Sequence, residues 1–144
     1  MAPFCPIHRL GILGRVDALR QSVLVFVGAG IGANGRYWAG VAMASRFGTA
    51  FPLGTLVVNL AGSFLIGLLM SLAISGEWST SWRVFLAAGC LGGFTTMSAF
   101  SYESLVLLNA RSYGPASLYV ALSLFGGIAM AWAGFALPRL WLGS

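Results

Sequence analysis

The chain has 144 residues, of which 58% are hydrophobic and 8% carry a charge, whereas an ordinary soluble domain carries about 25% charged residues. This composition excludes a soluble domain and indicates an all-α integral membrane protein with several spans in the inner or plasma membrane. The eight basic residues are all arginine and the net charge is +5, a pattern of membrane flanks rather than of a nucleic-acid partner. Two cysteines and one histidine offer neither a disulfide framework nor a metal cluster, and no pairing of a nucleophile with a base suggests an enzyme.

The first twenty residues have mixed character, and we expect them to form an extension, residues 1–20, before a membrane domain over residues 21–144. Residues 10–20 have the composition of a short amphipathic helix at the membrane interface. A cleavable signal peptide is poorly supported, because the apolar region that follows runs straight into a glycine-patterned span. We therefore expect the extension to be retained on the cytoplasmic side.

The first span is expected over residues 21–45. Gly28, Gly32, Arg36 and Gly40 are spaced four apart in it and so share one helical face, where small residues allow another helix to approach closely. An arginine at membrane depth costs roughly 2.5–3.5 kcal/mol on insertion scales, so it usually faces a bundle interior or a wet cavity. Arg36 fits this role, and it equally fits a side chain that snorkels to the far interface.

The second span lies within the uncharged run 47–76, and Pro52 is a suitable first-turn residue for its helix. Thr55, Asn59 and Ser63 are again four apart and make a polar stripe on one face. Asn59 could hydrogen-bond a neighbouring helix, a contact worth about 0.6 kcal/mol in membranes, or present its amide to a ligand in a pore. Three polar residues on one face favour the pore.

The third span is expected in the uncharged run Val84–Tyr102, whose length is sufficient to cross a bilayer. Near its middle, two glycines stand beside hydroxyl residues, at positions 92, 93, 95, 96 and 98. Glycine weakens a helix and hydroxyls offer the backbone other hydrogen-bond partners, so we expect a helix that is broken at its middle. Broken helices at membrane depth line a cavity or bind a ligand. A packing face made of small residues is the alternative.

The fourth span is expected over residues 115–137, with Tyr119, Ser123 and Gly127 at four-residue spacing. Pro138, Arg139 and Trp141 follow it, as interface anchors do. Four spans place both termini on one side of the membrane.

Three segments of the chain resemble the signatures of the CrcB, or Fluc, fluoride channel family. They are GANGRY (Gly32–Tyr37), GTLVVNLAGSFLIG (Gly54–Gly67) and GCLGGFTTMSAFSYE (Gly89–Glu103). The resemblance covers all four spans in order. It implies passive, selective export of fluoride that relieves fluoride toxicity. It also implies an antiparallel, dual-topology homodimer in the lipid bilayer, with two pores.

The resemblance also implies roles for particular residues. A structural Na⁺ would lie on the dimer axis, held by the backbone carbonyls of Gly92 and Thr95. The expected ion pathway contains Arg36 near the pore vestibule, Asn59 in the pore, the hydroxyls of Ser98, Tyr119 and Ser123, and Phe100 as the second phenylalanine of an aromatic pair. The first phenylalanine of that pair is replaced by Met97, and the threonine before the second by Ala99.

These residue types suit a small, strongly hydrated anion. Hydroxyl and amide donors can replace its water without trapping it as a buried arginine would, and the positive edge of a phenyl ring can face an anion. Met97 has no such edge, and its flexible thioether is a weak substitute.

Two other membrane classes are alternatives. A small multidrug exporter also has four short helices, but its proton exchange needs a membrane-embedded carboxylate, and we expect no Asp or Glu deep in a span. A non-conducting assembly subunit held by glycine packing explains the small residues, but not the polar stripe with Asn59 or the break.

Overall fold

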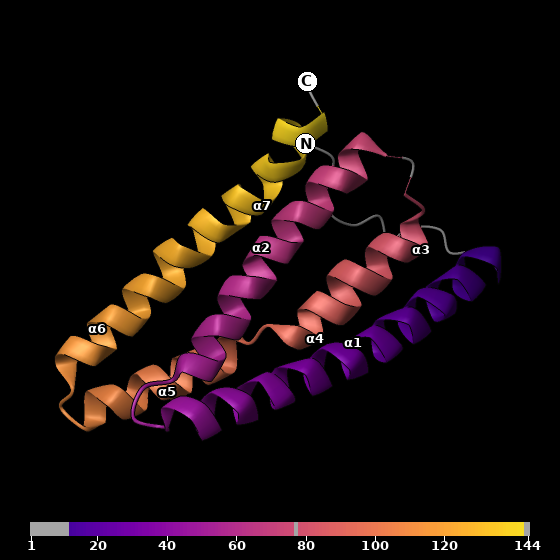
Figure 1. Cartoon of the computed structure of the whole chain (residues 1–144). Coiled ribbons are helices and arrows are strands. Elements are labelled where there is room, and N and C mark those ends of the chain that lie inside the picture. The colour runs from indigo at the N-terminus through magenta and orange to yellow at the C-terminus, as the bar shows by residue number, and fades with distance from the viewer. Residues whose placement is uncertain (1–11, 77, 143–144) are drawn as a thin grey trace.

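The computed structural model describes residues 12–76 and 78–142, and their regular structure is helical throughout (Figure 1). The helices in chain order are α1 (Ile12–Phe47), α2 (Leu53–Ser75), α3 (Thr80–Arg83), the π-helical segment η1 (Val84–Leu91), α4 (Gly92–Phe94), α5 (Met97–Asn109), α6 (Tyr113–Ala121), the π-helical segment η2 (Leu122–Gly126) and α7 (Gly127–Leu142).

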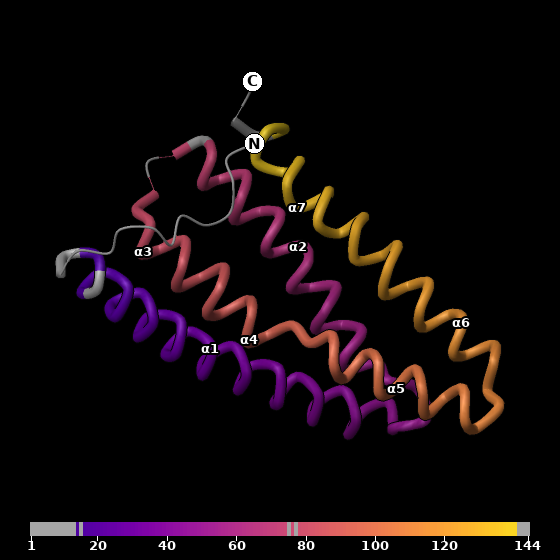
Figure 2. The backbone as a smooth tube through the Cα atoms, turned by 180° about the vertical axis from the view of Figure 1, so that it is seen from behind, coloured from indigo at the N-terminus to yellow at the C-terminus, as the bar shows by residue number. Residues whose placement is uncertain are grey.

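These elements contain four helical stretches that are long and apolar enough to cross a membrane: Val16–Phe47, Leu53–Ile74, Thr80–Asn109 and Tyr113–Leu140. The prediction of four spans is therefore confirmed. Consecutive spans run in opposite directions, so that α1 begins and α7 ends on the same side (Figures 1 and 2). The third span is made of α3, η1, α4 and α5, and the fourth of α6, η2 and α7.

Helix α1 is much longer than a membrane requires. Its 36 residues correspond to about 54 Å of helix at 1.5 Å per residue, against about 30 Å of hydrocarbon in a bilayer. The part of the expected extension that the structure describes, residues 12–20, forms the first turns of α1 and continues directly into the first span. The remainder of the extension lies outside the described residues.

The second and fourth spans pack along each other, α2 against α7 (Figure 1). Glycine makes this contact close. A Cβ atom on Gly67 would collide with the carbonyl oxygen of Ala131, and one on Gly134 would collide with that of Phe64. Since neither helix carries a side chain at these points, the two backbones touch directly, as small-residue interfaces in membranes allow.

The first and third spans form a second close pair, α1 against η1 and α4. A Cβ on Gly28 would come within 2.7 Å of the Phe85 carbonyl oxygen, and one on Gly93 within 2.5 Å of that of Ala29. A Cβ on Gly32 would collide with the Cys90 carbonyl oxygen. The glycine stripe of the first span therefore serves as a packing face at its first two positions.

The largest buried cluster lies where α5 and α6 meet α2. Leu56, Phe100, Leu107, Ala116 and Tyr119 pack together there, and the Tyr119 side chain is completely buried. This cluster anchors the second half of the third span after its break and so fixes the position of the residues next to the break.

Candidate functional site

The third span is interrupted at Thr95 and Thr96, which are both extended. Their backbone angles are φ −79°, ψ 158° and φ −150°, ψ 118°. The expected break is therefore present, at the pair of threonines that follows the glycines. Two helix ends meet at this point, the last turn of α4 and the first turn of α5 (Figure 2).

Thr96 caps the N-terminus of α5. Its Oγ1 accepts a hydrogen bond from the amide of Ala99 at 3.2 Å, and it lies 3.2 Å from the hydroxyl of Ser98. A threonine in extended conformation directly before the first helical residue is a favourable N-cap, because its oxygen satisfies an amide that has no partner within the helix. Thr95 turns its own hydroxyl back to the carbonyl of Leu91, at 3.0 Å.

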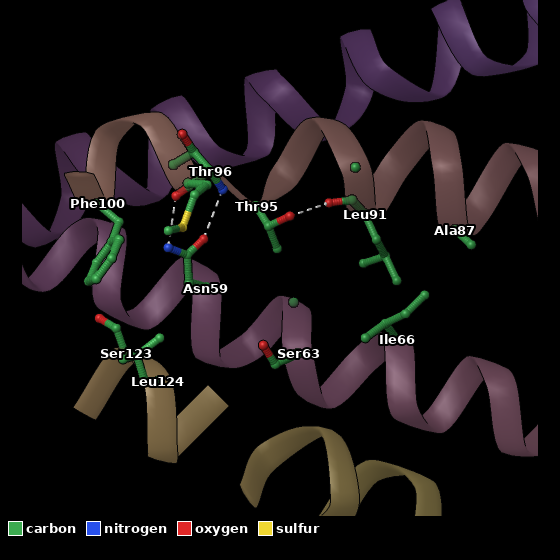
Figure 3. A pocket seen from close by; sticks show the side chains of 13 residues that line it. Asn59, Ser63, Ile66, Ala87, Leu91, Thr95, Thr96, Phe100, Ser123 and Leu124 are labelled. Carbon is green, nitrogen blue, oxygen red and sulfur yellow. Dashed lines mark hydrogen bonds between the residues drawn. The ribbon is translucent and has the colours of Figure 1, made fainter. Parts of the chain in front are cut away.

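Asn59 of α2 holds the break from the side. Its Nδ2 donates to the carbonyl oxygen of Thr96 at 3.0 Å, and its Oδ1 accepts from the amide of Thr96 at 2.8 Å (Figure 3). The side-chain amide of Asn59 thus makes two hydrogen bonds to the backbone of Thr96, one as a donor and one as an acceptor. This pair of bonds fixes the orientation of the amide and uses one of its two N–H donors.

These contacts divert two amides from their helical partners. In a continuous α-helix the amide of Thr96 would bond the carbonyl of Gly92, and that of Ala99 would bond the carbonyl of Thr95. The first instead donates to Asn59 and the second to the Thr96 hydroxyl. The carbonyls of Gly92 and Thr95, the two expected cation ligands, therefore lack the amide that normally satisfies each of them.

A cavity of about 390 Å³ lies beside the break, between α2, the third span and η2 (Figure 3). Six of the predicted site residues line it: Asn59, Gly92, Thr95, Met97, Phe100 and Ser123. The stripe of the second span contributes Ser63 as well. The structure thus brings residues from three spans to a single cavity.

Among the described residues, the lining offers one buried hydroxyl without a partner. The Oγ of Ser123 is buried and has no hydrogen bond among the residues that the structure describes. Phe100 is 8% exposed and its ring lies 5.4 Å from that of Tyr119, tilted by 46°. Met97 has the opposite character, since 68% of its surface is exposed although it lines the cavity.

Arg36 and Ser98 lie outside this cavity. Arg36 lines a separate cavity of about 450 Å³, together with Tyr37, Thr55, Thr96 and others. The two cavities share Thr96, so both adjoin the break. Ser98 is exposed and in contact with the Thr96 hydroxyl.

Tyr119 is engaged with an acidic residue that the sequence analysis left out of the site. Its hydroxyl donates to Oε2 of Glu103 at 2.6 Å, and Thr55 donates to Oε1 at 2.8 Å. Short distances of this kind are typical of hydrogen bonds to a carboxylate. Glu103 is half-buried and lies within α5, inside the helical stretch Thr80–Asn109 of the third span. The span therefore continues past the expected uncharged run, which ended at Tyr102, and includes this acidic residue.

The chain matches the model of one protein family, described as CrcB-like protein, Camphor Resistance (CrcB), over residues 23–135. A protein of Methylobacterium nodulans is 44% identical over 120 residues, which are 83% of this chain and 96% of that protein. One of Thermus thermophilus is 44% identical over 119 residues, 83% of this chain and 95% of the other. One of Chloroflexus aurantiacus is 46% identical over 128 residues, 88% of this chain and all of the other. Each of the three is named a fluoride-specific ion channel.

Proposed function

This chain belongs to the CrcB family, and on that premise we propose that it conducts fluoride selectively and passively out of the cell and so relieves fluoride toxicity. The observation that carries the proposal is the identity of 44% or more, over at least 83% of this chain, with relatives named fluoride-specific ion channels. The family match over residues 23–135 contains all three signature segments. The protein is a multi-pass membrane protein of a channel family and not an enzyme.

The ion pathway that we propose passes the cavity at the break. Fluoride must exchange its tightly held water for closely placed donors. The buried Ser123 hydroxyl is available for this purpose, since it has no partner among the described residues, and Asn59 keeps a second N–H donor. Phe100 can turn a positive ring edge to the anion. Tyr119 and Ser98 stay in the proposed pathway by resemblance, although neither lines this cavity and the Tyr119 hydroxyl donates to Glu103. Arg36 is assigned to the neighbouring cavity as an attractive charge at the vestibule.

We assign the working form to an antiparallel homodimer of dual topology. The exposure of Met97 at the cavity supports a partner that covers it. The charge pattern is compatible with insertion in both directions. With Arg9, Arg15 and Arg20 of the extension, the terminus side carries five arginines against two, which favours cytoplasmic termini. Without residues 1–20 the count is two against two, and we propose that the extension biases insertion only partly.

A structural Na⁺ on the dimer axis belongs to the same proposal. Backbone carbonyls that are freed where a membrane helix breaks are typical Na⁺ ligands. The carbonyls of Gly92 and Thr95 are free in this sense, because the amides that would bond them in a continuous helix donate instead to Asn59 and to the Thr96 hydroxyl. Two chains would supply four such oxygens. The hydroxyl of Thr95 is bonded to Leu91, which suits a site built from backbone oxygens alone.

The test is anion efflux from liposomes that contain the purified protein. We expect rapid loss of fluoride and retention of chloride, with and without a proton gradient. Equal efflux of the two anions would contradict selectivity. A fluoride flux that requires a proton gradient would contradict passive conduction and indicate a coupled transporter.

A further inference from the structure

Both the Nδ2 and the Oδ1 of Asn59 bond the backbone of the broken helix, at Thr96. This contact affects the backbone carbonyl that we assign to the cation. We infer that Asn59 is a positioning residue for the Na⁺ site, because it holds the Thr96 amide away from the carbonyl of Gly92. The inference rests on the cation in the proposed function and adds a second role for Asn59 beside the pore.

Two acceptors compete for the amide of Thr96. The Thr96 amide has two candidate acceptors, Oδ1 of Asn59, which it bonds at 2.8 Å, and the carbonyl of Gly92 four residues earlier, which it would bond in a continuous helix. An unsatisfied amide costs several kcal/mol in a membrane. If Asn59 loses its acceptor, we therefore expect the Thr96 amide to take the Gly92 carbonyl, which closes the break and consumes a cation ligand.

Helix α2 packs against the break and so keeps Asn59 next to it. Gly62, three residues after Asn59, lies on the same face of the helix. A Cβ on Gly62 would collide with Cγ2 of Thr95, and the cavity lining includes both residues. Because α2 touches both threonines of the break, the Asn59 amide has little freedom to leave the Thr96 backbone.

Substitutions of Asn59 can separate its role at the break from its role in the pore. Holding the Thr96 amide away from Gly92 requires an acceptor, whereas meeting an anion requires an N–H donor. Asn59→Asp keeps an acceptor for the Thr96 amide, loses the donor to the Thr96 carbonyl and places a carboxyl group in the anion path. Asn59→Leu removes both functions at similar volume. Asn34→Leu is the matched control, since the Asn34 amide bonds Gly30 of its own helix and is exposed.

The experiment measures the unfolding midpoint of each purified protein in detergent as NaCl replaces N-methylglucamine chloride at constant ionic strength. We expect Na⁺ to raise the unfolding midpoint of the wild type, Asn59→Asp and Asn34→Leu. The Na⁺ concentration that gives half of the maximal rise should agree among these three proteins within about threefold. For Asn59→Leu we expect a half-maximal concentration at least tenfold higher. Ligand linkage makes this shift a measure of Na⁺ binding, and a general loss of stability lowers the midpoint without changing its dependence on Na⁺.

The outcomes distinguish the two proposals. A wild-type midpoint that does not respond to Na⁺ would refute the cation and with it the role of Asn59, while fluoride efflux would still decide the channel function. A wild-type response that Asn59→Leu retains in full would refute the role of Asn59 alone. Loss of the response in Asn59→Asp as well would also refute it, because that variant keeps the acceptor. If Asn59→Leu does not elute like the wild type, Asn59→Ser replaces it. The serine side chain is too short for its hydroxyl to reach the Thr96 amide, so we again expect a half-maximal Na⁺ concentration at least tenfold higher.

Discussion

Replacing Phe100 by isoleucine tests whether an aromatic ring edge is needed for fluoride to pass. The ring of Phe100 lines the cavity at the break and is 8% exposed. The resemblance implies an aromatic pair at positions 97 and 100, and with Met97 at the first position Phe100 is its remaining ring. Isoleucine keeps the side chain apolar and branched but removes the ring edge.

The change has a structural cost and a functional effect, which can be estimated separately. Phe100→Ile loses the ring contact with Tyr119, whose centroid is 5.4 Å away. Such pairs contribute about 0.5–1.5 kcal/mol beyond their buried area, so the free energy of unfolding should fall by roughly 1–3 kcal/mol. For the flux we expect a loss of at least tenfold, which corresponds to about 1.4 kcal/mol in the barrier for the ion.

Leu107→Ala separates these two effects. Leu107 belongs to the same buried cluster and is also 8% exposed, but it is not among the residues that line the cavity. Truncating a buried leucine costs about 2–5 kcal/mol, at least as much as the change at Phe100. The assay is initial fluoride efflux from liposomes, normalised to the amount of dimeric protein incorporated. If Leu107→Ala loses as much flux as Phe100→Ile, or if Phe100→Ile conducts like the wild type, the ring edge has no special role.

Three further predictions concern the pore and its topology. Asn59→Asp should abolish fluoride efflux while the protein still elutes as a dimer, because it puts a carboxyl group in the anion path; efflux at the wild-type rate would return Asn59 to a purely structural role. Met97→Phe should keep the dimer and retain or raise the flux, because it restores the second ring edge; a strong loss of flux would show that the thioether is needed. In a variant without Cys5 and Cys90, a single cysteine added at the C-terminus should react with impermeant reagent from both sides of the membrane, and labelling from one side only would contradict the antiparallel dimer.

Much of the fold follows from composition and spacing. The four spans are evident as apolar stretches. The break in the third is indicated because Gly92 and Gly93 precede two threonines in an uncharged run that is long enough to cross a bilayer. The close contacts of Gly28 and Gly32 follow from their spacing of four. These features are local or depend on one helical face, and for that reason a single sequence can reveal them.

The pairing of side chains across spans could not be predicted in the same way. A polar stripe shows which residues of α2 share a face, but not that Asn59 would use both ends of its amide on Thr96. For Glu103, its charge argued against a place within a span, because a carboxylate is costly at membrane depth. The hydroxyls of Thr55 and Tyr119 offset that cost, and they come from two other spans, so the compensation becomes visible only in three dimensions.

The length of α1 has a consequence for how the protein is made. About 24 Å of this helix exceeds the hydrocarbon thickness, and the excess includes Arg20 and Asp17 at its beginning. In the proposed antiparallel dimer, half of the newly made chains would have to move this charged N-terminal part of α1 across the membrane before the rest of the helix can insert. Insertion in that direction should therefore be the slower of the two, and the supply of outward-facing chains would then limit how fast complete channels accumulate in a growing cell.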